Sequence, residues 1–385
     1  MFDAIVVGSG FSGAVISHEL ASNGKKVLVL EKRNHIGGNM YDEFDSNGFL
    51  IQQYGPHILY TNELSVVNYL SQFSDLVPFE CHMLSLLDGK YIHLPFNFQS
   101  IQELVGVNEA DLVIKGIRNN FDCKDRISIF TLMQAKDKHV SAFANLLFKK
   151  AFETYICKQW GLKPNQIDRS IIDRVKFTPN FTSRYLNSDY QFLPKEGFTK
   201  LISNMLNNPN ITIKLQSDAT KELSIENGKI WYKGESIPVF YSGSLDELFK
   251  YKYGPLPYRS IAFQTKYYKQ RQVLPCPIIS MPQDSKLNRK TEYKFFSPFV
   301  THKEDLLSIV VSEEPNQHDY RNSQSIQCYP IINEPDSKLY SKYLIEAKKV
   351  CNLYLCGRLA EYKYYNMDAV ILHSLNVSQS FLNLK

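Results

Sequence analysis

Three glycines near the N-terminus have the spacing of a nucleotide-binding turn. Gly8, Gly10 and Gly13 form the motif GSGFSG between an apolar run at 4–7 and a helical pattern at 11–23. Glycine at these positions lets phosphate groups approach the backbone and the N-terminus of the following helix. We therefore interpret the motif as a dinucleotide site with contacts from Gly8, Gly10, Phe11, Ser12 and Gly13.

A carboxylate at the end of the next strand supports this interpretation. Glu31 lies 18 residues beyond Gly13, where it could accept hydrogen bonds from both hydroxyls of an adenosine ribose. An anion at this place disfavours a 2′-phosphate, which leaves FAD or NAD as the cofactor. A structural glycine turn beside a surface glutamate is the alternative.

The stretch LEKRNHIGGNMY, which begins at Leu30, favours FAD. In flavoproteins of the amine-oxidase type and their relatives, a second glycine motif supports the diphosphate and the flavin end of FAD. This stretch resembles that motif in Arg33, Gly37, Gly38 and Asn39. The resemblance implies FAD, held by Lys32, Arg33, Gly38 and Asn39, whereas a plain turn is the alternative.

The elements that position these residues come from both ends of the chain. Residues 3–31 have the pattern of a strand, a glycine turn, a helix and a second strand. Near the C-terminus, a predicted strand at 350–357 and an amphipathic helix at 367–382 show the same pattern of a buried strand followed by a helix. The C-terminal piece is therefore predicted to complete the nucleotide domain.

Two other kinds of pattern fill the middle of the chain. Apolar residues at three-to-four spacing predict helices from about 100 to 175. Short β-rich runs predict an antiparallel sheet from about 185 to 332, and a hairpin is predicted at 82–94. We therefore predict an α/β fold with a discontinuous Rossmann-like FAD-binding domain over 1–80 and 345–385, a helical substrate-binding domain over 98–178, and an antiparallel β-sheet domain over 80–97 and 179–344.

Composition excludes several classes of protein. The 385 residues are 44% hydrophobic and 22% charged, as in ordinary globular proteins. The net charge is only +5, and the Lys and Arg residues are scattered among Asp and Glu, which argues against nucleic acid as a partner. No apolar run reaches about 18 residues, so no membrane insertion is expected, and the N-terminal run has the pattern of a buried strand rather than a signal. Seven cysteines without a CxxC pair predict reduced thiols and a cytoplasmic location, and no metal site is predicted.

Four segments together point to one family. They are GPHILYT at 55–61, YICKQWG at 155–161, RVKFTPNFTSRYLNSDYQFLP at 174–194 and GRLAEYKYYNM at 357–367. They resemble the bacterial UDP-galactopyranose mutase family, and the resemblance spans nearly the whole chain. It implies interconversion of the pyranose and furanose forms of a nucleotide-diphosphate sugar through an adduct between the sugar and N5 of reduced FAD. It further implies NAD(P)H or another reductant, a homodimer, and a role in surface polysaccharide such as O antigen.

The resemblance also assigns roles to single residues. Arg174 and Arg289 would face the diphosphate, for which the planar, permanently charged guanidinium is suited, and 174–194 would be a moving loop. Tyr155, Trp160 and Tyr185 would lie near the nucleotide, where aromatic faces stack on a base. The other implied substrate contacts are Phe152, Tyr329, Tyr364, Tyr60 and Asn366, and the other implied flavin contacts are His57, Gly357, Arg358 and Met367. Taken singly, these aromatics could be core residues and these arginines surface ion-pair partners.

Three positions depart from the family pattern. Tyr60 stands where the family has His, Cys81 or His82 where it has Asn, and Asn366 where it has Asp. The hypothesis that follows is a variant substrate, such as dTDP-fucose or UDP-N-acetylgalactosamine, alongside UDP-galactose. An amine-oxidase-like FAD oxidoreductase and a non-catalytic nucleotide-sugar sensor are the competing functions.

Overall fold

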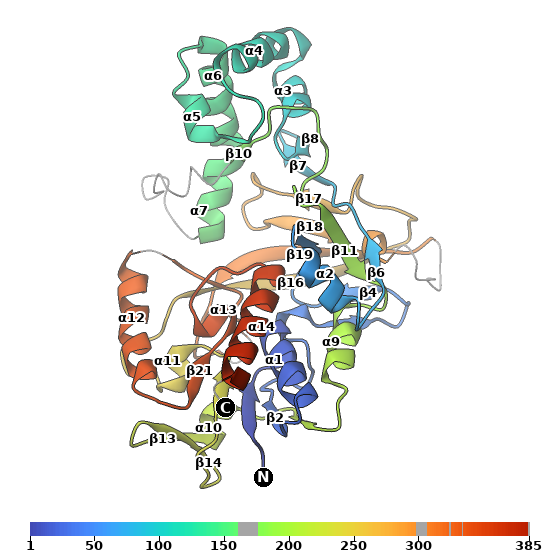
Figure 1. Ribbon diagram of the computed structural model, residues 1–385. Coiled ribbons are helices and arrows are strands. Elements are labelled where there is room, and N and C mark those ends of the chain that lie inside the picture. Colours follow the sequence, from blue (N-terminus) through green and yellow to red (C-terminus); the bar gives the residue numbers. More distant parts are fainter. Residues whose placement is uncertain (161–175, 298–305, 323–324, 333, 384–385) are drawn as a thin grey trace.

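The computed structural model describes residues 1–160, 176–297, 306–322, 325–332 and 334–383. Its parts follow one another along the molecule: a group of helices at one end, a curved antiparallel sheet in the middle, and a unit that holds both termini at the other end (Figure 1). An expected helix that falls within 161–175 lies outside the described residues.

A five-stranded parallel sheet forms the unit with the termini. Its order is β12 (Ile211–Lys214), β2 (Val27–Leu30), β1 (Ala4–Val7), β15 (Val239–Tyr241) and β21 (Leu353–Leu355). β1 and β2 are buried over their whole length, because a parallel sheet covered on both faces needs continuous apolar strands. This arrangement confirms the predicted α/β class with a Rossmann-like domain.

The C-terminal helix packs directly against the first helix. α1 (Phe11–Ser22) and α14 (Met367–Asn383) are in contact and lie side by side (Figure 1). The ring of Phe381 on α14 meets Phe240 of β15 edge-on at 5.1 Å, and Phe240 stacks on Tyr354 of β21 at 4.9 Å. The C-terminal strand and helix therefore complete the sheet that the N-terminal strand begins.

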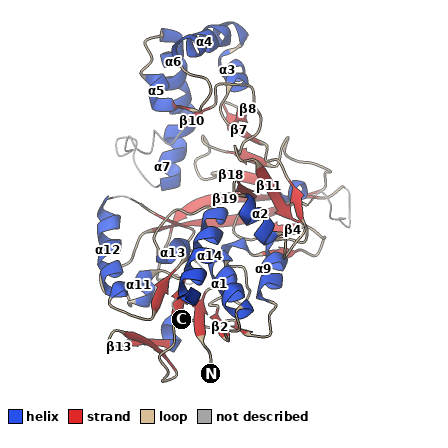
Figure 2. Ribbon diagram, viewed as in Figure 1, coloured by secondary structure: helices blue, strands red, loops and turns tan. Residues whose placement is uncertain are grey.

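The mostly antiparallel sheet has seven strands and crosses the middle of the molecule (Figure 2). Its order is β20 (Tyr329–Pro330), β16 (Tyr258–Tyr268), β19 (Ser308–Gln317), β18 (Arg289–Glu292), β17 (Ile278–Ser280), β7 (Met83–Leu87) and β8 (Lys90–Leu94). Neighbouring strands pair antiparallel except β17 and β7, which are parallel. The predicted hairpin is present: Asp88 and Gly89 both have positive φ, at 48° and 76°, which matches the twist of a two-residue turn between β7 and β8.

The helical part follows β8 in sequence. It consists of α3 (Phe98–Val105), α4 (Val107–Asn120), α5 (Ile129–Met133), α6 (Lys138–Leu147), η2 (Phe148–Glu153) and α7 (Thr154–Trp160). Asn97 and Ser100 form a reciprocal capping box at the start of α3, and Asp137 accepts backbone hydrogen bonds at the start of α6. α7 leads from this group back towards the antiparallel sheet (Figure 1).

The division of the segment 179–344 differs from the expected one. β12 and β15 lie inside that range but pair with the parallel sheet, so the range is not a single antiparallel domain. Three- and four-residue strands carry too little pattern to show which sheet they join.

The remaining elements are β3 (Asp42–Phe44), β4 (Leu50–Gln52), β5 (Leu59–Thr61), β6 (Leu76–Pro78), β9 (Ile127–Ser128), β10 (Lys176–Phe177), β11 (Tyr190–Pro194), β13 (Leu223–Glu226), β14 (Lys229–Tyr232), η1 (Gly38–Met40), α2 (Leu64–Leu70), α9 (Phe198–Leu206), α10 (Ala219–Glu222), α11 (Leu245–Leu248), η4 (Tyr293–Phe296), α12 (Glu334–Lys348) and α13 (Gly357–Ala360).

Candidate functional site

The first glycine turn is packed so tightly that a side chain would not fit at its third glycine. A Cβ added to Gly13 would lie 1.9 Å from the carbonyl oxygen of Gly8. Gly8 itself has a φ of +91°, and Gly10 is the N-cap of α1. The turn therefore brings backbone N–H groups and the N-terminus of α1 to one place, which is how such turns receive a pyrophosphate.

Two further glycine segments close over this turn. A Cβ on Gly38 would lie 3.0 Å from Cα of Gly10, and the Gly37 N–H donates to the Ser9 carbonyl at 3.1 Å. From the C-terminal motif, a Cβ on Gly357 would lie 2.7 Å from Oγ of Ser12. The structure thus brings together three glycine segments that are far apart in the sequence.

Glu31 lies at the edge of this glycine cradle and is 5% exposed. Its carboxylate accepts hydrogen bonds from the Ser9 N–H at 2.9 Å, the Ser9 hydroxyl at 2.5 Å and the Arg33 N–H at 2.9 Å. A carboxylate has about four acceptor positions, so at least one stays open for a ribose hydroxyl.

Two buried donors in the cradle have no hydrogen-bond partner within the described residues: Oγ of Ser12 and Nη1 of Arg33. The rest of the Arg33 guanidinium is fixed, because Nη2 donates to Asn39 at 2.8 Å and the group lies 4.4 Å from the centre of the Tyr54 ring. Buried donors of this kind are nearly always satisfied, here most simply by an anionic ligand. The cradle therefore fits the diphosphate of a dinucleotide cofactor, as the predicted FAD would require.

Three of the predicted cofactor residues have side-chain contacts elsewhere. Lys32 pairs with Glu247 on the surface at 3.2 Å. The buried ring of Phe11 packs edge-on against Phe198, with ring centres 6.2 Å apart, and Met367 packs against the hydrophobic core. For Lys32 and Phe11 only backbone contacts with the cofactor remain predicted, whereas the half-buried Met367 keeps its predicted contact.

Arg289 is held by a buried carboxylate on the neighbouring strand. It pairs with Glu313 in the register of β18 and β19, and its Nε lies 2.6 Å from Oε1 of Glu313. The side chain of Glu313 is 3% exposed, whereas that of Arg289 is 26% exposed and remains accessible to a ligand. Burial lowers the pKa of Arg289, but the attraction of Glu313 outweighs this and raises it, so the guanidinium stays protonated.

The GPHI loop lies against Arg289. A Cβ on Gly55 would meet Nη2 of Arg289 at 3.3 Å. The side-chain amide of Gln52 makes two hydrogen bonds to the backbone of His57: it donates to the His57 carbonyl at 3.1 Å and accepts from the His57 N–H. Burial lowers the pKa of His57 to about 3, and the nearby charges of Arg358 and Arg289 add to the effect. His57 is therefore a neutral imidazole at physiological pH.

Acid is expected to weaken the fold through His57. Its native pKa is below the value of about 6.5 in an unfolded chain, so the unfolded form takes up the proton first and stability is lost as the pH falls from about 6.5 towards 3. Between pH 7 and pH 5 we expect this residue to lower the free energy of unfolding by about 1–2 kcal/mol. Urea unfolding of the wild type and His57→Gln at both pH values measures this, and equal losses in the two proteins would contradict it.

Arg358 and two tyrosines form a stack. The ring centres of Tyr329 and Tyr364 are 5.6 Å apart, and the Arg358 guanidinium lies 5.2 Å and 5.4 Å from them. Arg358 is fixed by hydrogen bonds to the carbonyls of Cys328 at 3.3 Å and Tyr365 at 2.6 Å. The stack joins β20 to the C-terminal motif, and the roles of these residues stay a prediction.

Three more of the predicted tyrosines lie within electrostatic reach of these arginines. Burial raises the pKa of Tyr155 to about 12, and the charge of Arg289 opposes this. Burial likewise raises the pKa of Tyr60 to about 12, and the charge of Arg358 opposes this. Burial also raises the pKa of Tyr185, again against the charge of Arg289. These phenols therefore keep their protons and can donate hydrogen bonds to an anion.

Other predicted substrate residues are not placed in this cluster. Arg174 lies outside the described residues, and Trp160 is described only as the last residue of α7. The Phe152 ring packs edge-on against Phe96 at 5.1 Å. Asn366 is exposed, and its carbonyl accepts the Val370 N–H at the start of α14. Of the predicted moving loop 174–194, residues 190–194 form β11, which is paired on both sides.

Sequence reasoning missed Glu313 and Gln52. Glu313 lies in the middle of β19, two residues after its apolar run, and the sequence marks it only as an acidic residue that follows such a run. Gln52 carries no such signal, because its role depends on two backbone groups of a neighbouring loop. Both act by holding a predicted residue in place.

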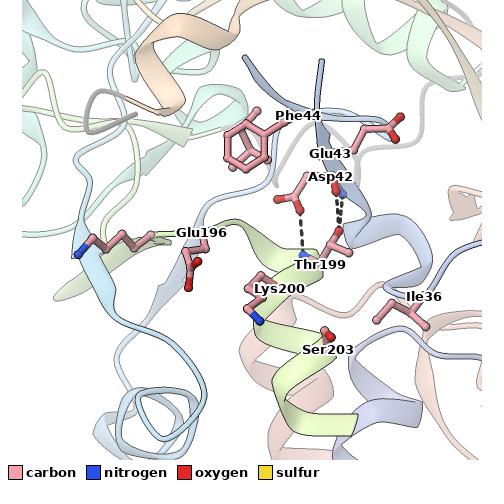
Figure 3. Close-up of a pocket in the computed structure, with 10 residues that line it drawn as sticks. Ile36, Asp42, Glu43, Phe44, Glu196, Thr199, Lys200 and Ser203 are labelled. Atoms are coloured by element: carbon pink, nitrogen blue, oxygen red, sulfur yellow. Dashed lines mark hydrogen bonds between the residues drawn. The ribbon is translucent and has the colours of Figure 1, made fainter. Parts of the chain in front are cut away.

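A hollow in the surface lies away from these residues. It measures about 540 Å³ and is lined by residues of β3, β4 and α9 with charges of both signs (Figure 3). The carboxylate of Asp42 on its wall already has hydrogen-bond partners at the start of α9: it accepts from the N–H groups of Phe198 at 2.7 Å and Thr199 at 2.9 Å. None of the predicted site residues lines it, so we do not assign it to the reaction.

The described part of the chain has neither a cluster of metal ligands nor a membrane-spanning helix. No group of three or more His, Cys, Asp or Glu residues there could hold a metal ion. No described helix combines the length and the apolar character needed to cross a bilayer.

Comparisons with known proteins give the family and the fold of the chain. Residues 150–364 match the family model described as UDP-galactopyranose mutase, and residues 6–73 match an NAD(P)-binding Rossmann-like domain. The chain is 35% identical to the UDP-galactopyranose mutase of Mycoplasma genitalium, over 99% of this chain and 95% of the relative. It is 30% identical to the dTDP-fucopyranose mutase of Escherichia coli, over 99% of both chains. The crystal structure of a reduced UDP-galactopyranose mutase has the same fold, with a TM-score of 0.69 at 13% identity, over 100% of this chain and 94% of that one.

Proposed function

The chain belongs to the UDP-galactopyranose mutase family, and from this premise we propose that it uses reduced FAD to interconvert the pyranose and furanose forms of a nucleotide-diphosphate hexose. One observation carries the proposal. Arg289, held by Glu313, meets the GPHI loop beside a set of protonated tyrosines, and Gly357 of the C-terminal motif joins this set to the glycine cradle. A diphosphate and a flavin could therefore lie side by side.

The cradle would hold the cofactor through groups that are already oriented. The glycine turn would receive the diphosphate, with Ser12 and Arg33 as donors, and Glu31 would accept from the ribose. When bound, reduced FAD supplies a nucleophilic nitrogen for the sugar, which the side chains of the protein need not provide.

The side chains would act on the departing nucleotide. Negative charge grows on the diphosphate as its bond to the sugar breaks, and the permanently charged Arg289 stabilises that charge. Tyr155, Tyr329 and Tyr364 would donate phenolic hydrogen bonds to the nucleotide, its phosphates or the sugar. Arg174 is proposed to act with Arg289 on the diphosphate, and Trp160 with Tyr155 and Tyr185 on the base.

Incubation of the purified flavoprotein with dithionite and a nucleotide sugar tests the function. Chromatography that resolves ring isomers is expected to show the furanose only after reduction. Turnover by the oxidised protein with release of an oxidised sugar would instead support an amine-oxidase-like enzyme. Tight binding of UDP without furanose would support a nucleotide-sugar sensor.

The proposed substrate is a variant hexose such as dTDP-fucose or UDP-N-acetylgalactosamine, with UDP-galactose as the comparison. Tyr60 supports this, because a partly buried phenol takes the place of the family's histidine and lies near Tyr364 and Tyr185. One 6-deoxy-sugar relative, the dTDP-fucopyranose mutase, covers the full chain.

Tyr60→His is expected to shift the preference towards UDP-galactose. A changed hydrogen bond in a sugar pocket alters discrimination by about 10-fold or more, so the ratio of kcat/KM for dTDP-fucose over UDP-galactose should fall by about that factor. Tyr60→Phe, which keeps the ring and removes the hydroxyl, is the matched control for shape. A clear preference of the wild type for UDP-galactose would refute the variant-substrate reading.

The proposal extends to a cytoplasmic homodimer that receives electrons from NAD(P)H or another donor. The seven cysteines support the location, since all are free thiols. Light scattering measures the assembly, and bleaching of the flavin on addition of NADH or NADPH tests the reductant.

A further inference from the structure

Lys158 places its ammonium group at the centre of a turn that the proposed reaction does not explain. Nζ donates to the carbonyl oxygens of Met281 at 2.7 Å, Asp284 at 2.7 Å and Leu287 at 2.5 Å. A lysine ammonium has three N–H donors, and here each has its own acceptor. The side chain thus gathers one turn of backbone around a single charge.

The turn at 281–288 directly precedes Arg289, the arginine that is proposed to face the diphosphate. The Met281 N–H donates to the Asn288 carbonyl at 2.8 Å, and the Asp284 carboxylate accepts from the N–H groups of residues 286 and 287, each at 2.8 Å. β18 then begins with Arg289, two residues after Leu287. Whatever fixes the turn therefore also fixes the start of the strand that carries Arg289.

Lys158 belongs to the helix that carries the predicted base-stacking residues. It lies on α7, three residues after Tyr155 and two before Trp160. The backbone of the helix is held at the same point, because Nη2 of the buried Arg259 donates to the Lys158 carbonyl at 3.0 Å. Side chain and backbone of one residue thus connect α7 to β16 and to the turn before β18.

We propose that Lys158 is a positioning residue that couples the nucleotide-binding helix α7 to the placement of Arg289. The proposal rests on the proposed mutase function. Lys158 would not touch the substrate; its three hydrogen bonds would keep the distance between Tyr155 and Arg289 matched to a nucleoside diphosphate, whose base and phosphates must be held together. A neutral side chain of similar length would leave the three carbonyls without this donor.

Lys158→Met in the FAD-loaded, full-length protein tests the coupling. We expect the dissociation constant for UDP to rise about 10-fold and kcat/KM for the nucleotide sugar to fall by at least as much. Lys158→Arg, which keeps a charged donor, is expected to recover part of both losses. Lys149→Met removes an exposed lysine from the preceding helix and is expected to change neither value by more than about twofold.

A double-mutant cycle separates positioning from plain stabilisation. If Lys158 acts through Arg289, Lys158→Met should change UDP affinity by less than about twofold in an Arg289→Ala background. An equal loss in both backgrounds, or a lower melting temperature with unchanged UDP affinity, would overturn the proposal. Should Lys158→Met fail to fold, the same cycle is run with Lys158→Gln or Lys158→Arg. If the wild type forms no furanose, the proposed function fails; if it does and the cycle is additive, the Lys158 inference alone fails.

Discussion

Replacing Arg289 with alanine is expected to lower kcat/KM by about 10²–10³-fold, because a fixed cationic donor to the charge that develops in the reaction is lost. The loss should exceed that of an ordinary surface ion pair, since Arg289 is oriented by a carboxylate that is 3% exposed. Removal of the guanidinium also leaves Glu313 as a buried carboxylate without its partner. Initial rates of furanose formation by the dithionite-reduced protein measure the effect.

Two matched variants show whether geometry or charge is responsible. Arg289→Lys keeps the charge but not the planar pair of donors, so an intermediate loss is expected. Lys290→Ala changes the neighbouring residue, whose side chain points to the other face of β18, and should leave turnover within about twofold of the wild type. Full turnover by Arg289→Ala would exclude Arg289 from leaving-group stabilisation.

Gly13→Ala is expected to abolish flavin binding. The added Cβ would lie 1.9 Å from the Gly8 carbonyl oxygen and 3.2 Å from Cγ1 of Val6. The backbone at Gly8 has little freedom to yield, because its N–H is bonded to the Leu30 carbonyl at 2.9 Å and Ser242 lies on its other side. The turn must therefore open, which displaces the N–H groups that receive the diphosphate.

The flavin-to-protein absorbance ratio after purification with added FAD measures this outcome, and far-UV circular dichroism reports whether the chain is folded. Gly24→Ala is the control: no atom lies within 4 Å of the added Cβ, although its φ of +78° adds a backbone cost of roughly 1 kcal/mol that Gly13, inside α1, does not have. The control should retain flavin. A full complement of flavin in Gly13→Ala would show that this glycine turn does not form the cofactor site.

The sequence alone determined the nucleotide-binding unit. Local pattern suffices there, since the spacing of Gly8, Gly10 and Gly13, the apolar strands beside them and Glu31 lie within one βαβ unit. The class of reaction was also accessible, because four motifs along the chain carry the family resemblance. Tyr329, Tyr364 and Arg358 were predicted in this way, and the structure brings them into one stack.

Only the tertiary structure decided which groups hold these residues in place. Glu313 acts through Arg289, which the register of two strands places beside it. Lys158 acts through the carbonyl groups of a distant turn. No local sequence pattern specifies that register or that turn. The same reason explains the wrong assignment of β12 and β15, whose short apolar runs fit either sheet. Residue type and spacing can reveal a site that is built from one motif or from its backbone groups. The orientation of the side chains in such a site depends on packing between segments that are far apart in the sequence, and no local pattern shows it.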